Sequence, residues 1–333
     1  MINIEYAVMK KRLNDILIER AVPEDLADKI SCVMTDNTCD GVASHGINRF
    51  NKMIDYIEDG YIDPQARPEV VSKTGAMAVV DGHLGFGVTN AWFGMQSAMD
   101  LAGQYGIGCV ALRNTNHWMR GATYGLQAAE QGYIGICFTN TLPNMPAWGA
   151  KSSRIGNNPL IIAVPNEAHP VVLDMAMSQF SYGKMETLAL EDAKLPMEGG
   201  YDTEGKLTNE PKAVLQSGRI LPTGFWKGSG LSIVLDLMAS VLSGGLGTRE
   251  IGERPVENAV SQVFIAIDPV QSTERQLIEE KVKATLEYIK ASEKMEDVNE
   301  IYYPGERSQK RREENLKNGI PVNEAVWANI VRL

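Results

Sequence analysis

The sequence has few of the residues that mark disulfide-bonded or metal-bound proteins. Only four of its 333 residues are cysteines, and Cys32, Cys39, Cys109 and Cys137 show neither zinc-ligand nor CxxC spacing. Four is a low density for a disulfide scaffold, so we expect a reducing compartment. Histidines are equally scarce, and none of the four has a ligand-type residue at i+3 or i+4, so no metal site is predicted.

Long apolar runs and basic clusters are absent as well. No stretch of about 18 uninterrupted apolar residues occurs, and the first residues lack the basic and apolar segments of a secretion signal. The formal net charge is -10, and lysine and arginine are spread along the chain. We therefore expect a cytoplasmic protein that binds neither nucleic acid nor a membrane.

What is present is the composition of a globular enzyme, with 44% hydrophobic and 22% charged residues. Apolar residues at helical spacing predict a helical cluster over roughly the first 65 residues. Its helices are expected at 6–20, from Pro23 onward, and from an N-cap at Ser44 to Gly60.

Beyond Pro68 short apolar runs alternate with helices, a pattern that indicates an α/β fold. The predicted strands are 76–80, 108–112, 134–138, 160–164, 171–173 and 263–267, with helices at 89–102 and 231–242. The polar segment 198–211 is predicted to be an exposed excursion, and 274–289 and 307–318 to be amphipathic helices.

A dinucleotide fingerprint begins but is not completed at Gly85-Phe86-Gly87. The position of the third glycine holds Asn90, and no acidic residue closes a strand about 20 residues further on. We predict that this segment is a turn into a helix, so a nicotinamide cofactor would need another route. A G-x-S-x-G nucleophile turn is missing too.

His45 lies in Ser44-His45-Gly46, followed by Arg49. A histidine can donate a proton to a developing alkoxide near neutral pH, and an arginine can bind a carboxylate through two N–H groups. The pair could therefore bind and reduce a 2-keto acid. Spacing alone favours the alternative, in which His45 supports a helix start and Arg49 is solvated.

His117 lies in a polar loop that follows a predicted strand, together with Asn116, Trp118 and Arg120. Loops at the ends of buried strands often carry ligand-binding groups. A surface loop anchored by its tryptophan fits the sequence equally well. His83 and His169 lie in turn-like contexts, and we interpret both as structural.

Three further segments could hold a dinucleotide without a Rossmann turn. Residues 174–178 follow a predicted strand, and Trp226-Lys227-Gly228 places a cation at a glycine-lined helix start. Residues 304–307, Pro-Gly-Glu-Arg, form a turn into a late helix. Each signal is weak by itself.

Taken together, these segments resemble the malate/L-lactate dehydrogenase-like oxidoreductases over essentially the whole chain. The resemblance rests on Ser44-His45-Gly46-Ile47-Asn48-Arg49, Asn157-Asn158-Pro159-Leu160, Leu173-Asp174-Met175-Ala176-Met177-Ser178, Lys227-Gly228 and Pro304-Gly305-Glu306, which occur in the family's order. It implies a fold that is not a Rossmann fold, a homodimer, and NADH, with NADPH possible, as the cofactor. We expect a mixed-sheet α/β domain at 71–270 and a helical domain formed by 1–70 with 271–333.

Residue roles follow from the same resemblance. His45 is implied to be the proton donor, and Arg49, His117 and Arg120 to bind the substrate. The implied cofactor contacts are Val172, Leu173, Asp174, Met175, Ala176, Met177, Ser178, Trp226, Lys227, Gly305, Glu306 and Arg307.

Within the family, Trp118-Met119-Arg120 replaces a His-Phe-Gly pattern common in malate and lactate members, and resembles members that reduce a diketo sugar acid. The alternatives are a malate, lactate or ureidoglycolate dehydrogenase, and a non-catalytic protein that binds NADH or a sugar acid.

Overall fold

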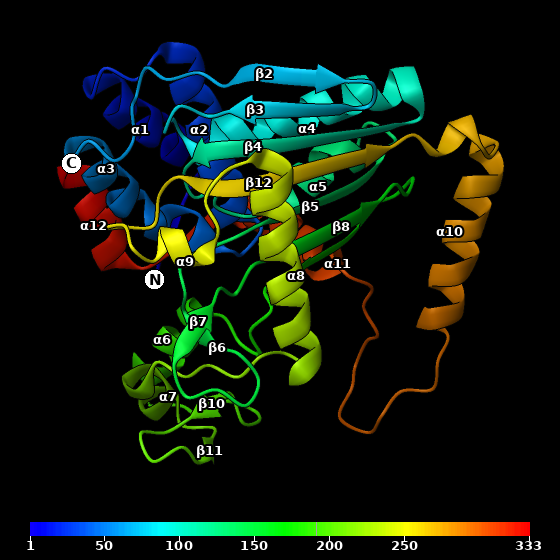
Figure 1. The fold of residues 1–333 in the computed structure, drawn as a ribbon. Coiled ribbons are helices and arrows are strands. Elements are labelled where there is room, and N and C mark those ends of the chain that lie inside the picture. The colour runs from blue at the N-terminus through cyan, green and yellow to red at the C-terminus, as the bar shows by residue number, and fades with distance from the viewer. Residues whose placement is uncertain (191) are drawn as a thin grey trace.

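The computed structural model describes residues 1–190 and 192–333, and a seven-stranded sheet forms its centre (Figure 1). In spatial order the strands are β2 (Glu69–Thr74), β3 (Met77–Asp81), β4 (Ile107–Thr115), β12 (Val260–Ile267), β5 (Ile134–Thr139), β8 (Leu160–Val164) and β9 (Val171–Met175). The β3–β4 pair is parallel and the other neighbours are antiparallel. The prediction of an α/β fold with a mixed sheet is therefore confirmed.

Helices cover both faces of this sheet. Helices α4 (Gly87–Tyr105) and α5 (Ala122–Ala129) bury one face, where Val110 and Leu112 of β4 point. Helix α8 (Trp226–Ser243) packs on the opposite face against Ala111, because successive side chains of a strand point to opposite sides. The β3–α4–β4 unit supplies the parallel pair.

The two ends of the chain meet in a separate helical cluster. Strand β1 (Ile2–Ile4) pairs with β13 (Ile320–Val322), and both ends of the chain lie on the left side of the molecule in Figure 1. Around this pair α1 (Tyr6–Glu19), α2 (Glu24–Cys39), α3 (Phe50–Glu58) and α12 (Glu324–Arg332) share one core of buried side chains. The division into two domains stays a prediction.

Helix α10 (Arg275–Lys290) departs from that cluster. It stands away from the body at the right of Figure 1, and none of its residues is buried. The chain returns to the body with α11 (Glu306–Asn318), which contacts α2. Residues 271–333 therefore contribute both to the terminal cluster and to a projecting arm.

One local prediction was wrong. Ser44 does not cap a helix, because residues 43–49 form two short 3-10 turns, η1 (Ala43–His45) and η2 (Ile47–Arg49), with Gly46 between them. Helix α3 begins only at Phe50, without a side-chain cap. The segment 198–211 is largely exposed, as predicted, and contains a short hairpin, β10 (Gly200–Tyr201) with β11 (Leu207–Thr208).

That hairpin belongs to a small lobe with its own core of Met185, Leu195, Val214 and Ile220. Helices α6 (Tyr182–Leu190) and α7 (Pro211–Ser217) complete the lobe. The remaining elements are β6 (Met145–Pro146), β7 (Ser153–Ile155), α9 (Thr248–Ile251) and η3 (Pro269–Gln271). Within the described part of the chain, no helix combines the length and the apolar character needed to cross a membrane.

The start of α4 explains the glycines that resembled a fingerprint. A Cβ atom at Gly87 would lie 2.1 Å from the carbonyl oxygen of Asn116 and 2.4 Å from that of His117. Glycine is therefore required because the helix abuts the loop that carries His117. The prediction of a turn into a helix is confirmed, and the helix begins two residues earlier than expected.

Gly87→Ala should lower the free energy of unfolding by about 1–3 kcal/mol, because the new methyl group must displace a backbone. Gly103→Ala in the same helix is the matched control: its Cβ would lie 3.5 Å from the Tyr133 hydroxyl, an ordinary contact. Helix propensity then makes that variant neutral or more stable. Denaturant unfolding of both variants tests this, and equal stabilities would contradict it.

Candidate active site

A cavity of about 400 Å³ lies where the terminal helical cluster meets the sheet. It receives side chains from the η1 turn, from the loop after β4, from the end of β5 and from β9. The residues in its wall include Ser44, His45, His117, Arg120, Thr139, Asn140, Thr141, Asn157, Val172, Asp174, Ala176, Glu257, Gln262, Gly305 and Ser308. Three of the four residues predicted for catalysis and substrate binding thus line one cavity.

The last turn of α2 holds His45 in place. The Asn37 side chain donates a hydrogen bond of 2.9 Å to the His45 carbonyl oxygen, and the Thr38 hydroxyl accepts one of 3.0 Å from the Ile47 N–H. A Cβ at Gly46 would lie 2.3 Å from that hydroxyl, so only glycine allows this approach. The two 3-10 turns are therefore folded onto α2, and His45 faces the cavity.

His117 lies beside His45, with ring centroids 5.7 Å apart and planes inclined by 24°. The Nδ1 atom of His117 accepts a hydrogen bond of 3.0 Å from the Met119 N–H. In the neutral ring the proton is then on Nε2, which can donate to a ligand. The Nδ1 atom of His45 is 3.1 Å from the Ser44 hydroxyl.

Both histidines are neutral at pH 7 in this arrangement. Burial, together with the nearby cations Arg49 and Arg120, lowers the pKa of His45 to about 4. Burial, and then Arg49, also lower the pKa of His117 well below its usual value. An anion bound beside these cations would oppose the effect, because it would favour the protonated ring.

Asp174 is the carboxyl group on the opposite wall. Its Oδ2 atom accepts a hydrogen bond of 2.9 Å from the Ala122 N–H, at the start of α5. The side chain is open to the cavity but otherwise enclosed by protein, and this burial raises the pKa of the carboxyl group despite Arg120 nearby.

The two arginines are held differently. The Nη2 atom of Arg49 is 3.9 Å from Glu257, and Arg49 lines a small adjoining cavity of about 30 Å³ behind His117. The guanidinium of Arg120 pairs with Asp40 and lines the main cavity. Positive charge thus lies on two sides of the histidine pair.

The three segments predicted to bind the cofactor lie side by side. The Val172 N–H donates to the Pro304 carbonyl oxygen at 2.9 Å, which joins the 172–178 segment to the turn before α11. At the other end, the Thr223 N–H donates to the Met177 carbonyl oxygen at 2.9 Å, immediately before the α8 start. The segments form one continuous strip that begins at the cavity.

Alternate residues of the strip face the cavity. Val172, Asp174, Ala176 and Gly305 line it, whereas Met175 and Met177 pack beneath α8. Leu173 is partly exposed, outside the cavity wall.

The other predicted cofactor contacts lie outside the cavity. Trp226 and Lys227 are exposed in the first turn of α8. Glu306 pairs with Lys290 and accepts from the Tyr303 N–H, and the Arg307 guanidinium stacks 4.5 Å over the Tyr302 ring. Glu306 and Arg307 thus lie next to the strip, but their side chains contact residues 290, 302 and 303 and so stabilise the turn before α11.

One buried polar atom in the cavity wall fits the presence of a nucleotide. Several buried side-chain atoms of the described residues have no hydrogen-bond partner, among them the Ser178 hydroxyl and the Oε1 atom of Gln262. Gln262 lines the cavity, so an amide or hydroxyl group of a bound ligand would satisfy its Oε1 atom, whereas Ser178 is not part of the cavity wall. The residues present therefore fit a nicotinamide dinucleotide.

Sequence reasoning missed four residues at this site: Asn37, Asp40, Glu257 and Gln262. Asn37 and Asp40 end α2, Glu257 precedes β12, and Gln262 is a buried polar residue within β12. No local spacing connects them to His45. A polar residue in the middle of an apolar strand, as at Gln262, was the one available signal.

Comparison with known proteins agrees with this geometry. The family model described as malate/L-lactate dehydrogenase matches residues 4–331, and the chain belongs to that family. It is therefore an oxidoreductase of the 2-hydroxy acid dehydrogenase type that uses a nicotinamide cofactor.

Curated relatives and solved structures narrow the comparison. A Pasteurella multocida protein named 2,3-diketo-L-gulonate reductase is 45% identical over 331 residues, 99% of both chains, and a Klebsiella pneumoniae protein of the same name is 43% identical with the same coverage. Malate dehydrogenase from Entamoeba histolytica has a TM-score of 0.95 at 26% identity, covering 99% of this chain and 96% of that one. Sulfolactate dehydrogenase from Methanocaldococcus jannaschii gives 0.91 at 31% identity, with 99% and 95% coverage.

The cations around His45 make its titration a direct test of the geometry. In the free protein the ring should titrate with a pKa of about 4, and Arg49→Gln should raise that pKa because a repelling cation is removed. With only four histidines, NMR titration of ring protons resolves each one.

Lys52→Gln is the matched control. Lys52 contributes to lowering the pKa of His117 but is not among the causes of the shift at His45. It should therefore raise the pKa of His117 alone. A wild-type His45 that titrates near 6.5 would show that the ring is not enclosed as described.

Proposed function

We propose that the protein reduces 2,3-diketo-L-gulonate to 3-dehydro-L-gulonate with NADH, and that His45 donates the proton. The observation that carries the proposal is the placement of His45 in a cavity flanked by two arginines, Arg49 and Arg120. The names of the curated relatives support the choice of substrate. A 2-keto acid offers the groups that such a site would bind, a carboxylate and an adjacent carbonyl.

The proposed roles follow from position. Residues 172–178, Trp226 with Lys227, and Gly305 to Arg307 would hold NADH, which supplies the hydride for the C2 carbonyl carbon. Arg49 and either His117 or Arg120 would bind the carboxylate and hydroxyl groups and so orient the carbonyl toward His45. His45 would then protonate the carbonyl oxygen as negative charge develops there.

Because the pKa of His45 is low, its protonation would follow substrate binding. At pH 7 the free ring is neutral and has no proton to donate beyond its single N–H. A bound carboxylate would offset the charges of Arg49 and Arg120 and raise the pKa of His45. Proton uptake would therefore accompany substrate binding, and the acid would form only when a substrate is present.

Trp118 and Arg120 support a sugar acid over a smaller keto acid. Trp118 is buried against Tyr124 and Phe264, so it fixes the loop, and Arg120 offers N–H donors at the cavity wall. Hydroxyl groups of a six-carbon acid would use such donors. Malate, lactate or ureidoglycolate oxidation is the alternative within the same family.

We further propose a homodimer in the cytoplasm. Helix α8 exposes an apolar face that includes Val234, Leu237 and Val241, and the Val241 side chain is 75% exposed. An apolar patch of this kind on a helix usually marks a protein interface. The arm formed by α10 has no buried residue and is likewise available to a second copy.

Initial rates of NADH and NADPH oxidation with 2,3-diketo-L-gulonate, oxaloacetate, pyruvate and oxalurate, measured side by side, test the function. The account predicts the highest kcat/KM for diketogulonate with NADH. A preference for a smaller acid would retain the mechanism but reject the substrate. Tight NADH binding without turnover of any acid would indicate a binding protein.

His45→Gln should lower kcat by roughly 100-fold or more while leaving NADH affinity unchanged, because a general acid is lost. His83→Gln is the control, since that ring is exposed beside Glu69, outside the cavity. Near-normal turnover by His45→Gln would reject its role as proton donor.

A further inference from the structure

Arg120 occupies a boundary in the structure. It lines the cavity of His45 and also a second cavity, of about 730 Å³, between α5, α2 and the arm that carries α10. In the described part of the chain it is the one residue shared by both cavity walls. Its side chain is only 9% exposed, so contacts with other protein groups, and not with solvent, fix the position of the guanidinium.

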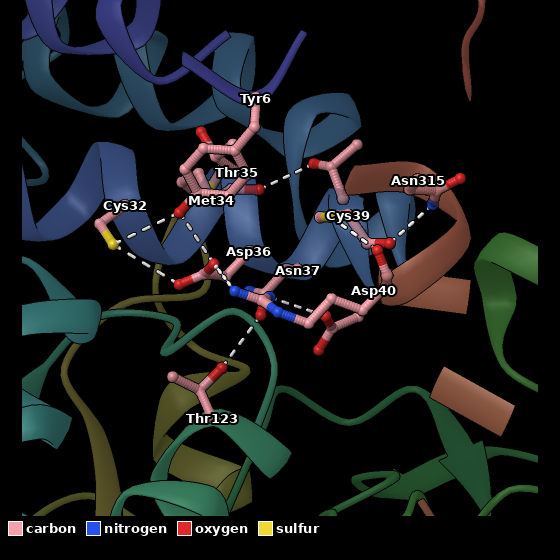
Figure 2. Close-up of polar contacts among 12 residues, drawn as sticks. Tyr6, Cys32, Met34, Thr35, Asp36, Asn37, Cys39, Asp40, Thr123 and Asn315 are labelled. Carbon is pink, nitrogen blue, oxygen red and sulfur yellow. Dashed lines mark hydrogen bonds and ion pairs between the residues drawn. The ribbon is translucent and has the colours of Figure 1, made fainter. Parts of the chain in front are cut away.

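Asp40 is the partner that fixes this position. It lies at the C-terminal end of α2 (Figure 2), and both of its carboxylate oxygens accept a hydrogen bond from an arginine. Oδ2 pairs with Nη1 of Arg120, and Oδ1 accepts a bond of 2.9 Å from Nη1 of Arg312 on α11. A carboxylate bound on both sides cannot rotate away from either arginine.

Arg312 is itself anchored on α2. Its Nη2 atom donates to Oδ1 of Asp36 at 2.7 Å, and Asp36 also accepts from the Tyr6 hydroxyl at 2.9 Å. Asn315, one turn further along α11, donates to the Cys39 carbonyl oxygen at 2.6 Å, as Figure 2 shows. The Asp40 carboxylate is thus held by a rigid contact between two helices.

The remaining N–H groups of Arg120 are available. A guanidinium carries five N–H donors, and Asp40 is its one hydrogen-bond partner among the described residues. Arg120 is also near enough to Asp174 and His45 to shift the pKa of both. Arg120 therefore has N–H donors left over in the neighbourhood of His45 and Asp174.

We propose that Asp40 is a positioning residue for substrate recognition. By bridging Arg120 and Arg312, it fixes the Arg120 guanidinium at the cavity wall and leaves the other N–H donors for the substrate's carboxylate or hydroxyl oxygens. The inference rests on the proposed role of Arg120 in substrate binding. It adds that substrate binding also requires the Asp40 carboxylate, which does not line the cavity of His45.

The test is a double-substitution cycle with Asp40→Asn, Arg120→Gln and the double variant, assayed with whichever 2-keto acid the wild type reduces fastest. Each single change should raise KM for the acid on the order of 10-fold, because a charge-assisted hydrogen bond is lost or misplaced. The KM for NADH should stay within about 2-fold. Asp40→Asn should add nothing to KM once Arg120 is absent, since it acts through Arg120.

Asp36→Asn is the matched control on the same helix. It removes the other carboxylate bound by Arg312 but touches neither Arg120 nor the cavity. It should lower thermal stability yet leave KM for the acid within about 2-fold. If Asp40→Asn does not fold, Asp40→Glu, which keeps the charge but moves it by one methylene, takes its place in the cycle.

Each outcome is decisive. Non-additive KM effects would support the proposal. Additive effects, an equal KM rise in Asp36→Asn, or no KM effect of Arg120→Gln would overturn it. Because the cycle uses the best substrate of the wild type, it stays informative even if that substrate is not diketogulonate.

Discussion

Two side chains at the C-terminal end of α2, Asn37 and Asp40, hold different parts of the candidate site in place. Asn37 donates to the backbone of the His45 turn and accepts from the Thr123 hydroxyl at the start of α5, while Asp40 pairs with Arg120. Figure 2 shows the hydrogen bond between Thr123 and Asn37, which links α5 to α2. Helix α2 thereby fixes His45, Arg120 and α5 relative to one another in a single frame.

This frame depends on tight backbone contacts that few sequences tolerate. Gly46 has no room for a side chain against Thr38, and Gly87 has none against the carbonyl groups of Asn116 and His117. The first contact presses the His45 turn onto α2, and the second presses α4 onto the His117 loop. The stacked histidines are the result, and their separation is set by packing and not by a direct bond.

The electrostatics follow from the same enclosure. Burial and flanking arginines keep His45 neutral, while burial favours the protonated form of the Asp174 carboxyl group. Each arginine beside the histidines has a carboxylate partner, Asp40 for Arg120 and Glu257 for Arg49. In the proposed function, a bound keto acid anion would add negative charge beside these cations and so raise the pKa of His45.

The sequence predicted the sheet and most helices because apolar periodicity reports burial directly, as in β4 and α4. It also predicted, through family resemblance, which cavity-lining histidines to examine. It could not predict Asp40, because its partners Arg120 and Arg312 lie 80 and 272 residues away and its local context only indicated a helix end. The wrong prediction at Ser44 has a similar origin. Serine is a good N-cap residue, but the tertiary contact of Gly46 with α2 folds this segment into a 3-10 turn, and local propensity carries no information about that contact.

The turnover number of Asn37→Ala tests most directly whether the end of α2 frames the site. The account predicts that kcat falls on the order of 10-fold while NADH affinity is unchanged and the unfolding free energy drops by about 1 kcal/mol. Thr35→Ala, which removes a hydroxyl that donates to the Ser31 carbonyl oxygen within α2, should lose stability but not turnover. An Asn37→Ala enzyme with wild-type kcat would contradict the account, because His45 would then be held in place without this contact.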